Sequence, residues 1–402
     1  MTKVLHVVYQ CYPNISGSST RTQHILDSQK SAGIEPVVIS SPGQKPENTK
    51  FRKDKENVSG IDYYRTFIFS NLSIGGRSNW LVKLKKIISF PYFVYKLWKV
   101  CDIEKPDIIH AHAMFYCAIA ALIIGKLTST PVVYEIRSLW YINSNSKQKE
   151  FLKKIAVKLE CFAIRTSDAI VAISDGIKNE FAMQRDDIVV VRNAIEASED
   201  IGVVCDVRNI KKFAYIGSVI ELEGLDNVIR AFSVLNQKYP DLEFHVFGGG
   251  SKLEELKELA KALNSPTVFH GQVLPSDIKS CYRDIDCIIN YRNDEPISHL
   301  VTPLKPLEAV LFNKPLICSE VGGYLEILGG RDHAFFVPTN DIDALINEII
   351  FISDPGNEEA LTLRVSRAKK FVLSNRVWSA NVDIYKAIYS GLKKITTTSN
   401  KI

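Results

Sequence analysis

The sequence lacks the features that would place the chain in a membrane or outside the cell. Its longest apolar run, residues 113–125, is too short for a bilayer, which needs about 20 residues. No signal-peptide pattern occupies residues 1–9, and the eight cysteines include no C-x-x-C pair. These absences predict a cytoplasmic protein whose thiols are reduced.

A strong charge of one sign is missing as well. The chain has 50 Lys and Arg residues against 45 Asp and Glu residues, which leaves a formal net charge of +5. A dedicated nucleic-acid binder normally has a more basic stripe, so we expect no nucleic-acid partner. A mild positive charge still permits contact with anionic phosphates or lipid head groups.

What is present is enough apolar sequence for two soluble domains. The 402 residues are 46% hydrophobic and 24% charged. We predict an α/β fold with a first domain over residues 1–196 and a second domain over residues 210–377. Residues 197–209 are polar and irregular, so they are expected to form the linker. A terminal helix is predicted over residues 378–394 from its apolar spacing.

The first elements indicate a doubly wound parallel sheet. Residues 4–9 are short, apolar and β-branched, which is typical of a buried parallel strand. A loop containing Gly17 follows, and a helix is expected to begin near Arg21. Strand, loop and helix in this order form the first unit of such a sheet. The loop has no G-x-G-x-x-G, so a dinucleotide site is not expected there.

Polar side chains follow two of the predicted strands. His110 and His112 end the strand near residues 107–111, and Glu135 and Arg137 end the strand at residues 132–137. Doubly wound folds bind ligands at the carboxyl ends of their strands. Satisfied structural roles are the alternative. No cysteine or third histidine keeps metal-ligand spacing with the histidine pair, so zinc is not expected.

Residues 300–323, LVTPLKPLEAVLFNKPLICSEVGG, carry the densest group of site signals. A loop that leads into a helix offers unpaired N–H groups and a positive dipole end to a phosphate. The Glu308 carboxylate, one turn inside, can accept hydrogen bonds from a sugar diol. Gly322 and Gly323 permit a ligand to approach the backbone. Each feature alone is also compatible with an ordinary surface loop.

Residues 79–100 mix lysines with aromatic residues. One interpretation is an amphipathic helix that packs on the sheet and is kinked or split at Pro91. The other is a patch that contacts an anionic membrane, with aromatic rings dipping into the interface and lysines on the head groups. Both interpretations stay open at this point.

Residues 300–323 resemble the donor-binding segment of glycosyltransferase family 4. Members of this family have the GT-B fold, in which two Rossmann-like domains face a central cleft. The family pattern E-x7-E would end at Glu308, while its first glutamate would fall at Leu300 and is absent. The variant LVTPLKPLEA is similar to a subgroup of bacterial enzymes that build polysaccharides, and in it the segment carries a lysine, here Lys305. The resemblance covers nearly the whole chain and implies that the terminal helix packs back on the first domain.

The resemblance implies a retaining, metal-independent glycosyltransferase with a UDP- or GDP-linked sugar as donor and no other cofactor. His112 would lie beside the donor sugar, and Glu308 would hold the ribose hydroxyls. The candidate catalytic residues are His112, Glu135 and Lys305. The candidate donor-binding residues are Gly17, Arg21, Arg137, Asn193, Gly217, Ser218, Gly248, Arg292, Thr302, Leu304, Lys305 and Glu308. The diphosphate cradle is expected from the Gly217 N–H and the loop from Thr302 to Lys305.

The chain departs from the family in the loop after Gly217. The family usually has an arginine and a lysine there, whereas this chain has Ser218 and Glu223. Losing two cations and gaining an acid weakens phosphate binding unless other cations compensate. The expected replacements are Lys305, Arg292 and Arg137.

The triplet from Asp284 to Asp286 looks like the D-x-D metal motif of other glycosyltransferases, but it precedes an apolar strand, so Asp286 is expected at the strand edge. The expected acceptor is a lipid-linked or growing polysaccharide at the cytoplasmic face of the inner membrane, in capsule, exopolysaccharide or lipopolysaccharide synthesis. Two alternatives remain. One is an inactive homologue that acts as a binding or regulatory subunit. The other is a UDP-sugar epimerase. Such an enzyme needs a paired acid and base in its cleft, and His112 and Glu135 would meet that need only loosely.

Overall fold

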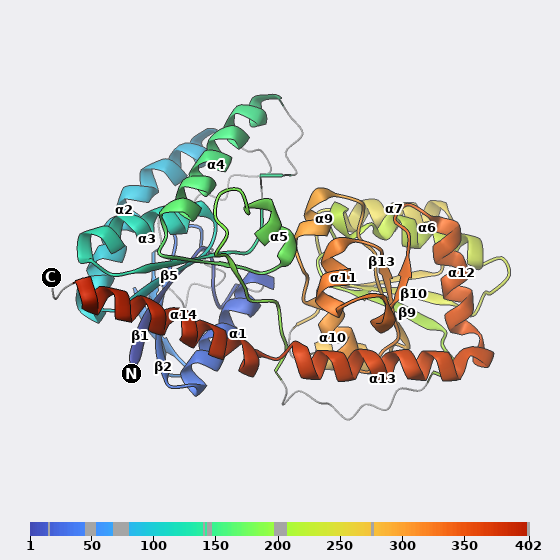
Figure 1. The fold of residues 1–402 in the computed structure, drawn as a ribbon. Coiled ribbons are helices and arrows are strands. Elements are labelled where there is room, and N and C mark those ends of the chain that lie inside the picture. The colour runs from blue at the N-terminus through green and yellow to red at the C-terminus, as the bar shows by residue number, and fades with distance from the viewer. Residues whose placement is uncertain are drawn as a thin grey trace. The chain divides into compact units, whose positions relative to one another are not determined.

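The chain divides into two compact units, which are described separately here. A computed structural model describes residues 1–14, 17–44, 54–66, 80–139, 141–142, 147–196, 207–274 and 277–399. The first unit contains Met1–Val191 and Trp378–Ile402, and the second contains Arg192–Val377 (Figure 1). The second unit therefore begins before the expected linker, of which residues 197–206 lie outside the described residues.

The first unit is built on an eight-stranded sheet with the order β3-β4-β2-β1-β5-β6-β7-β8. All neighbouring strands are parallel except β3 and β4. The strands are β1 (Thr2–Val8), β2 (Ile34–Ser40), β3 (Lys55–Val58), β4 (Ile61–Arg65), β5 (Ile108–Ala113), β6 (Val132–Ile136), β7 (Ala169–Ala172) and β8 (Val189–Val190). The helices are α1 (Gly17–Ser31), α2 (Trp80–Glu104), α3 (Phe115–Thr128), α4 (Lys147–Thr166), α5 (Asp175–Glu180) and α14 (Trp378–Ser399).

The second unit is built on a six-stranded parallel sheet with the order β11-β10-β9-β12-β13-β14. The strands are β9 (Lys212–Ile216), β10 (Glu243–Phe247), β11 (Thr267–Gly271), β12 (Cys287–Asn290), β13 (Leu316–Ser319) and β14 (Phe335–Val337). The α-helices are α6 (Leu225–Leu235), α7 (Leu253–Ala262), α8 (Ile278–Arg283), α9 (Pro296–Leu300), α10 (Lys305–Leu311), α11 (Gly322–Leu328), α12 (Ile342–Ser353) and α13 (Glu358–Asn375). Short 3-10 turns are η3 (Glu221–Glu223), η4 (Arg331–His333) and η5 (Pro355–Asn357).

Both faces of the second sheet are buried, which explains why its strands are apolar throughout. Side chains alternate between the faces along β9. Phe213 and Tyr215 belong to a core that includes residues of α6 and α12. Ala214 and Ile216 belong to a second core that includes residues of α10, α11 and α13. Two cores on one sheet make this unit a three-layer α/β/α sandwich whose strand ends are the natural place for a site.

The predicted fold class, two doubly wound parallel sheets, matches the observed topology, whereas several elements differ from the predictions. Helix α2 is one helix through Pro91 and does not split there. Strand β3 forms in a polar stretch, and α13 was not predicted. The last strand, β14, begins at Phe335, because Arg331–His333 forms a 3-10 turn before it. The terminal helix continues beyond residue 394 to Ser399.

Candidate active site

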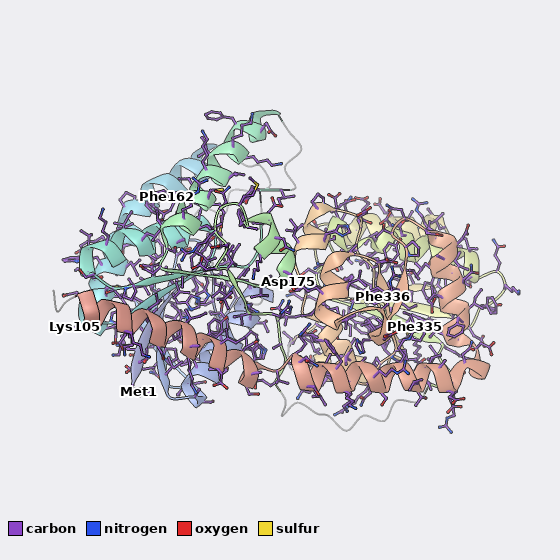
Figure 2. The ribbon with its side chains drawn as sticks, viewed as in Figure 1. Met1, Lys105, Phe162, Asp175, Phe335 and Phe336 are labelled. Atoms are coloured by element: carbon purple, nitrogen blue, oxygen red, sulfur yellow. The ribbon has the colours of Figure 1, made fainter. Side chains whose placement is uncertain are left out.

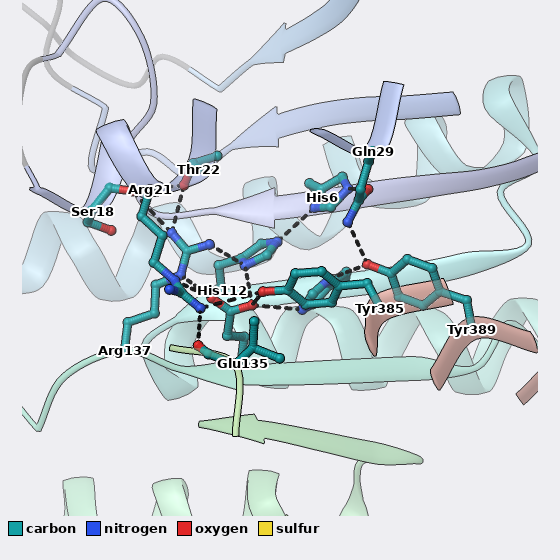
Figure 3. Close-up of polar contacts among 12 residues, drawn as sticks. His6, Ser18, Arg21, Thr22, Gln29, His112, Glu135, Arg137, Tyr385 and Tyr389 are labelled. Atoms are coloured by element: carbon teal, nitrogen blue, oxygen red, sulfur yellow. Dashed lines mark hydrogen bonds and ion pairs between the residues drawn. The ribbon is translucent and has the colours of Figure 1, made fainter. Parts of the chain in front are cut away.

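In the first unit, polar side chains from three neighbouring strands meet helices α1 and α14 (Figure 3). The strand register makes this contact possible, because His6 on β1 pairs with His110 on β5. His112, two residues further along β5, pairs with Glu135 on β6. We call this group the histidine–arginine cluster. Its members are His6, Arg21, Gln29, His110, His112, Glu135, Arg137, Tyr385 and Tyr389.

Glu135 is the anion at the centre of the histidine–arginine cluster. Its Oε1 accepts hydrogen bonds from Nε of Arg21 at 3.0 Å and from Nε of Arg137 at 2.8 Å. Its Oε2 accepts one from the Tyr385 hydroxyl at 2.6 Å. Burial alone would raise the pKa of this carboxyl, but Arg137 and Arg21 hold it well below its ordinary value. Glu135 is therefore an ionised counter-ion at neutral pH.

Arg137 distributes its donors over three elements. Its Nη1 donates to the backbone oxygen of Ser18 at 3.1 Å and to Oγ1 of Thr22 at 2.7 Å. Its Nη2 donates to Nδ1 of His112 at 2.6 Å. The planar guanidinium thus fixes α1, β5 and the end of β6 relative to one another. An arginine with these partners is a structural centre of the unit as well as a candidate ligand residue.

The three imidazoles are buried and stay neutral. His112 lies 2.8 Å from His6, between Nε2 and Nδ1, and His110 hydrogen-bonds through Nδ1 to the Tyr389 hydroxyl at 2.7 Å. Burial, with repulsion from Arg137, lowers the pKa of His112 to about 4. Burial, with repulsion from His112, lowers the pKa of His6 and of His110 well below the ordinary value.

The expectation that no third histidine accompanies His110 and His112 was wrong. His6 joins them from the neighbouring strand, and one ring nitrogen of each lies within 4.8 Å of the others, a spacing that can hold a metal ion. Arg137 and Tyr389 already occupy ring nitrogens of this trio. A metal ion there would add charge beside a guanidinium, so the donor set suits a hydrogen-bonded network better than a metal centre.

The structure thus brings together four predicted site residues, Arg21, His112, Glu135 and Arg137. Their side chains point at one another, and all four are almost completely buried. The fifth predicted residue of this unit, Gly17, is the exposed first residue of α1. A methyl group added there would meet no atom of the described residues within 4 Å, so packing against them does not require a glycine at this position.

In the second unit, Lys305 and Arg292 converge on the same carboxylate. Nζ of Lys305 lies 2.9 Å from Oε2 of Glu223, and Nη2 of Arg292 lies 3.5 Å from its Oε1. Burial would raise the pKa of Glu223, but the two cations lower it below its ordinary value. Burial, together with Arg292, lowers the pKa of Lys305, and Glu223 opposes that shift. We call Glu223, Arg292 and Lys305 the cation cluster.

The cation cluster lies directly at the loop that follows β9. Lys305 hydrogen-bonds to the Tyr215 hydroxyl, and its Nζ lies 4.5 Å from the centre of the Tyr215 ring. A Cβ on Gly217 would come within 2.4 Å of Cε of Lys305. Gly217 therefore leaves the space through which the lysine reaches the strand end. Of the three expected replacements, Lys305 and Arg292 lie beside Glu223 in this unit, whereas Arg137 belongs to the first unit.

The Gly217 N–H was expected to help hold a phosphate. In the structure it donates a hydrogen bond to the Phe247 oxygen at 2.9 Å instead. Gly248 packs against the same loop, and a Cβ on it would lie 1.8 Å from the Gly217 oxygen. Its φ of +147° also disfavours a side chain. The glycines at the ends of β9 and β10 thus allow two loops to pack backbone against backbone.

The remaining predicted residues line the loop before α10. Nδ2 of Asn193 donates to the Thr302 oxygen at 2.6 Å, which holds the start of this loop. Leu304 is the N-cap residue of α10, and Glu308 lies half-buried in its first turn. Ser218 is exposed in the loop after β9. Asn193 therefore acts by positioning the loop that carries the lysine of the cation cluster.

Asp286 has a structural role in the described chain. Its Oδ2 accepts hydrogen bonds from the backbone N–H groups of Lys211, at 2.9 Å, and of Lys212, at 2.8 Å. The carboxylate thus ties the start of β12 to the start of β9. This is the strand-edge position that the sequence favoured over a D-x-D metal motif.

Sequence reasoning missed the partners of the predicted residues. His6 is a single polar residue inside an apolar strand, and that exception was the available signal. Tyr385 and Tyr389 lie in the predicted terminal helix, but no sequence pattern indicated that their hydroxyls bond to Glu135 and His110. Tyr215 lies in an apolar strand, and nothing in its neighbourhood pointed to the lysine.

Comparison with solved structures shows that the chain has the GT-B fold. The sucrose-phosphate synthase of Thermosynechococcus elongatus aligns with a TM-score of 0.76 at 15% identity, over 98% of this chain and 99% of its own. Anabaena HepE in complex with UDP-glucose aligns with a TM-score of 0.71 at 15% identity, over 97% of this chain and 100% of its own.

Sequence comparison then gives the family. Residues 15–199 match Glycosyltransferase Family 4, and residues 207–367 match Glycosyl transferases group 1. An uncharacterized glycosyltransferase of Methanocaldococcus jannaschii is 22% identical over 82% of this chain and 86% of its own length. The mannosylfructose-phosphate synthase of Agrobacterium fabrum is 24% identical over 54% of this chain and 51% of its own. The chain belongs to this family and is a glycosyltransferase.

Proposed function

We propose that this glycosyltransferase moves a sugar from a UDP- or GDP-linked donor to a lipid-linked or growing polysaccharide, with retention of configuration and without a metal ion. The bond from the anomeric carbon to the donor phosphate breaks, and a bond to an acceptor oxygen forms on the same face. The leaving phosphate oxygen takes the proton of the acceptor. Support for the donor class comes from HepE, a relative in fold that was solved with UDP and with UDP-glucose.

The observation that carries the proposal is the cation cluster at the carboxyl end of β9. A leaving diphosphate needs fixed positive charge, and Lys305 and Arg292 provide two cations there against one carboxylate. Glu308 is half-buried in the first turn of α10, and its proposed role is to hold the ribose hydroxyls. Thr302 and Leu304 shape the loop that leads to Lys305.

The roles proposed for the first unit follow from its hydrogen bonds. Both ring nitrogens of His112 have protein partners, so its proposed contribution beside the donor sugar is positional and it does not transfer a proton. Glu135 is held ionised, so we propose that it keeps Arg21 and Arg137 in place. The same bonding argues against an epimerase, which needs a free acid and a free base.

The decisive experiment compares Lys305→Ala with Lys252→Ala in a donor-turnover assay. Lys252 is a matched control because it is a lysine of the same unit that pairs with the exposed Glu221 and Glu255. We expect Lys305→Ala to lose about 100-fold in kcat/KM, the loss typical of removing one charge-stabilising donor. Lys252→Ala is expected to stay within about twofold, since surface ion pairs contribute little. Equal, small effects would contradict the proposed donor site, and absent turnover in the wild type would favour an inactive homologue.

We also propose that the acceptor is met at an anionic membrane, on the cytoplasmic face of the inner membrane. In the described part of the chain no helix is long and apolar enough to span a bilayer. Many of its large exposed apolar residues lie on three helices of the first unit: Tyr92, Tyr95, Trp98 and Ile103 on α2, Ile123 and Leu127 on α3, and Phe151, Ile155 and Phe162 on α4. Figure 2 labels Phe162, which is 52% exposed.

The charge of these helices fits the same partner. Lys99 on α2, Lys126 on α3, and Lys154, Lys158 and Arg165 on α4 are exposed beside the apolar residues. Aromatic rings with lysines between them suit the head-group region of an anionic bilayer. Of the predicted patch, residue 79 and the side chains of residues 80–88 lie outside the described residues, and Phe93 is completely buried in the unit.

Liposome flotation tests the membrane proposal. The wild type is expected to float with anionic vesicles and much less with neutral phosphatidylcholine vesicles. Lys83/Lys85/Lys86→Glu and, separately, Phe151/Phe162→Ser are expected to remain at the bottom of the gradient. Lys257→Glu on α7 of the second unit is the control and should float like the wild type. Unchanged flotation of both multiple variants would remove this surface from the proposal.

A further inference from the structure

The cation cluster contains an acid whose position needs an explanation. Glu223 is 2% exposed, whereas the side chains of Lys305 and Arg292 are 18% and 10% exposed. The carboxylate therefore lies behind the two cations, and an anion arriving from solvent would meet the cations first. A carboxylate in that position both holds the cations and subtracts from their charge.

The surroundings of Arg292 are prepared for a polar ligand. Among the residues that the structure describes, its buried Nε has no hydrogen-bond partner, and neither does the hydroxyl of Tyr324, whose ring centre lies 5.4 Å from the guanidinium carbon. In the described part of the second unit, the side chains of Asn290 and Ser298 are also buried without hydrogen bonds. Unpaired buried polar atoms cost free energy, so their concentration in one region points to a partner that binds there.

We propose that Glu223 tunes how tightly the enzyme holds a pyrophosphate-bearing ligand, so that the nucleoside diphosphate product is released after transfer. The inference rests on the proposed donor site. Two cations without a carboxylate would bind a diphosphate more strongly, because each additional net charge changes the attraction by a large factor where water is partly excluded. Glu223 reduces the net charge of the cluster from two positive charges to one and so sets an intermediate affinity.

Glu223 also holds the two cations in position, which an exposed cation in the loop could not do. It lies on η3, two residues after Glu221, and reaches Lys305 on α10 and Arg292 after β12. By contacting both cations it keeps them near the Gly217 loop when no ligand is bound. A site that carries its own counter-ion is ordered before the donor arrives, and Glu223→Gln keeps the size of that side chain while removing its charge.

The test measures binding of inorganic pyrophosphate and of UDP by titration calorimetry to a series of variants that change the charge of the cluster. Glu223→Gln carries one more positive charge than the wild type, Lys305→Gln carries one fewer, and the double variant equals the wild type. We expect affinity for pyrophosphate to rise about tenfold in Glu223→Gln and to fall about tenfold in Lys305→Gln. Glu221→Gln, the same change on an exposed side chain of η3, should bind within twofold of the wild type.

Weaker or unchanged binding by Glu223→Gln would overturn the proposal and leave Glu223 with a purely structural role. If Glu223→Gln fails to fold, the decision passes to the double variant, which must bind pyrophosphate more tightly than Lys305→Gln does. In turnover, Glu223→Gln is expected to lower both KM and kcat, with stronger inhibition by the product diphosphate. Because pyrophosphate binding needs no sugar transfer, tighter binding by Glu223→Gln without turnover in the wild type would contradict the proposed function but not the effect of Glu223 on pyrophosphate affinity.

Discussion

Arg137 donates a hydrogen bond from Nη2 to Nδ1 of His112 at 2.6 Å, and this contact determines the protonation of its neighbours. A guanidinium has no acceptor, so Nδ1 of His112 must be unprotonated and Nε2 must carry the hydrogen. His112 therefore donates to Nδ1 of His6, and His6 donates through Nε2 to Oε1 of Gln29, at 2.9 Å. One arginine thus orients two imidazoles on different strands.

The same chain of bonds continues to the third histidine. Nε2 of Gln29 donates to the Tyr389 oxygen at 3.0 Å, so the Tyr389 hydroxyl is free to donate to Nδ1 of His110. His110 then carries its hydrogen on Nε2, which lies 3.5 Å from Oε2 of Glu135. Glu135 in turn accepts from Arg137, but among the described residues no hydrogen bond joins Nε2 of His110 to Glu135, so the chain of hydrogen bonds ends at His110.

We therefore predict that His6, His110 and His112 are all neutral Nε2–H tautomers at pH 7. Long-range ¹H–¹⁵N NMR correlation spectra of labelled protein report the tautomer of each ring directly. Arg137→Lys is expected to remove the oriented donor and to change the His112 pattern, while the exposed His299 keeps its own. An Nδ1–H tautomer at His112 in the wild type would contradict the direction assigned to this chain.

A second prediction concerns stability in acid. The ordinary histidine value is 6.5, and in the folded chain the pKa of His112 is about 4, with those of His6 and His110 also well below their ordinary value. Below pH 6.5 the unfolded chain binds protons that the folded chain does not, so the free energy of unfolding falls as the pH falls toward 4. Three such groups give a slope of up to about 4 kcal/mol per pH unit.

Urea unfolding of the wild type between pH 7 and pH 5 measures this slope. His6→Gln removes one of the three imidazoles. The slope is therefore expected to fall by roughly 1.4 kcal/mol per pH unit, the contribution of one proton. His299→Gln removes an imidazole that is 45% exposed and serves as the control. A wild-type slope near zero in this range would show that the cluster takes up protons without unfolding.

A third prediction tests Glu135 as the counter-ion of two arginines. Glu135→Gln leaves Arg21 and Arg137 buried without a compensating charge, and breaking a buried pair in this way costs about 3–5 kcal/mol. Thermal and urea unfolding should therefore show a large loss of stability. Glu150→Gln, an exposed glutamate at the start of α4, is expected to change stability by less than about 0.5 kcal/mol. Similar midpoints for the two variants would refute the buried ion-pair role.

The sequence was sufficient to predict where the site residues lie along the strands. His112 and Glu135 were expected at the carboxyl ends of their strands, and the parallel sheet brings them side by side. The direction of their side chains could not be predicted, because it depends on partners from distant segments. Tyr385 reaches Glu135 from the last helix of the chain, and no local pattern announces such a contact.

The cation cluster illustrates the same limit in the second unit. Lys305 was expected to compensate for Ser218 and Glu223, and its position beside Gly217 agrees with that reasoning. Glu223 was expected only to weaken phosphate binding. The sequence shows that this residue is acidic, but it does not show that the carboxylate lies behind two cations. Helix α13 was not predicted, although Leu361, Val365 and Val372 recur at helical spacing.

The last prediction separates glycines needed for packing from a glycine available for a ligand. Gly248→Ala places a Cβ 1.8 Å from the Gly217 oxygen at a φ of +147°, so it should cost about 2 kcal/mol or more of stability. The expected result is a lower unfolding midpoint together with weaker UDP binding, because the displaced loop lies against the cation cluster.

Gly17→Ala meets no atom within 4 Å and should leave the unfolding midpoint unchanged or slightly raised. If Gly17 approaches the donor, as the family resemblance implies, this variant should lose donor affinity while keeping its stability. UDP-sugar titration of the two variants beside their unfolding curves distinguishes the two kinds of glycine. Normal affinity and normal stability in Gly17→Ala would remove Gly17 from the candidate site and leave the other residues unaffected.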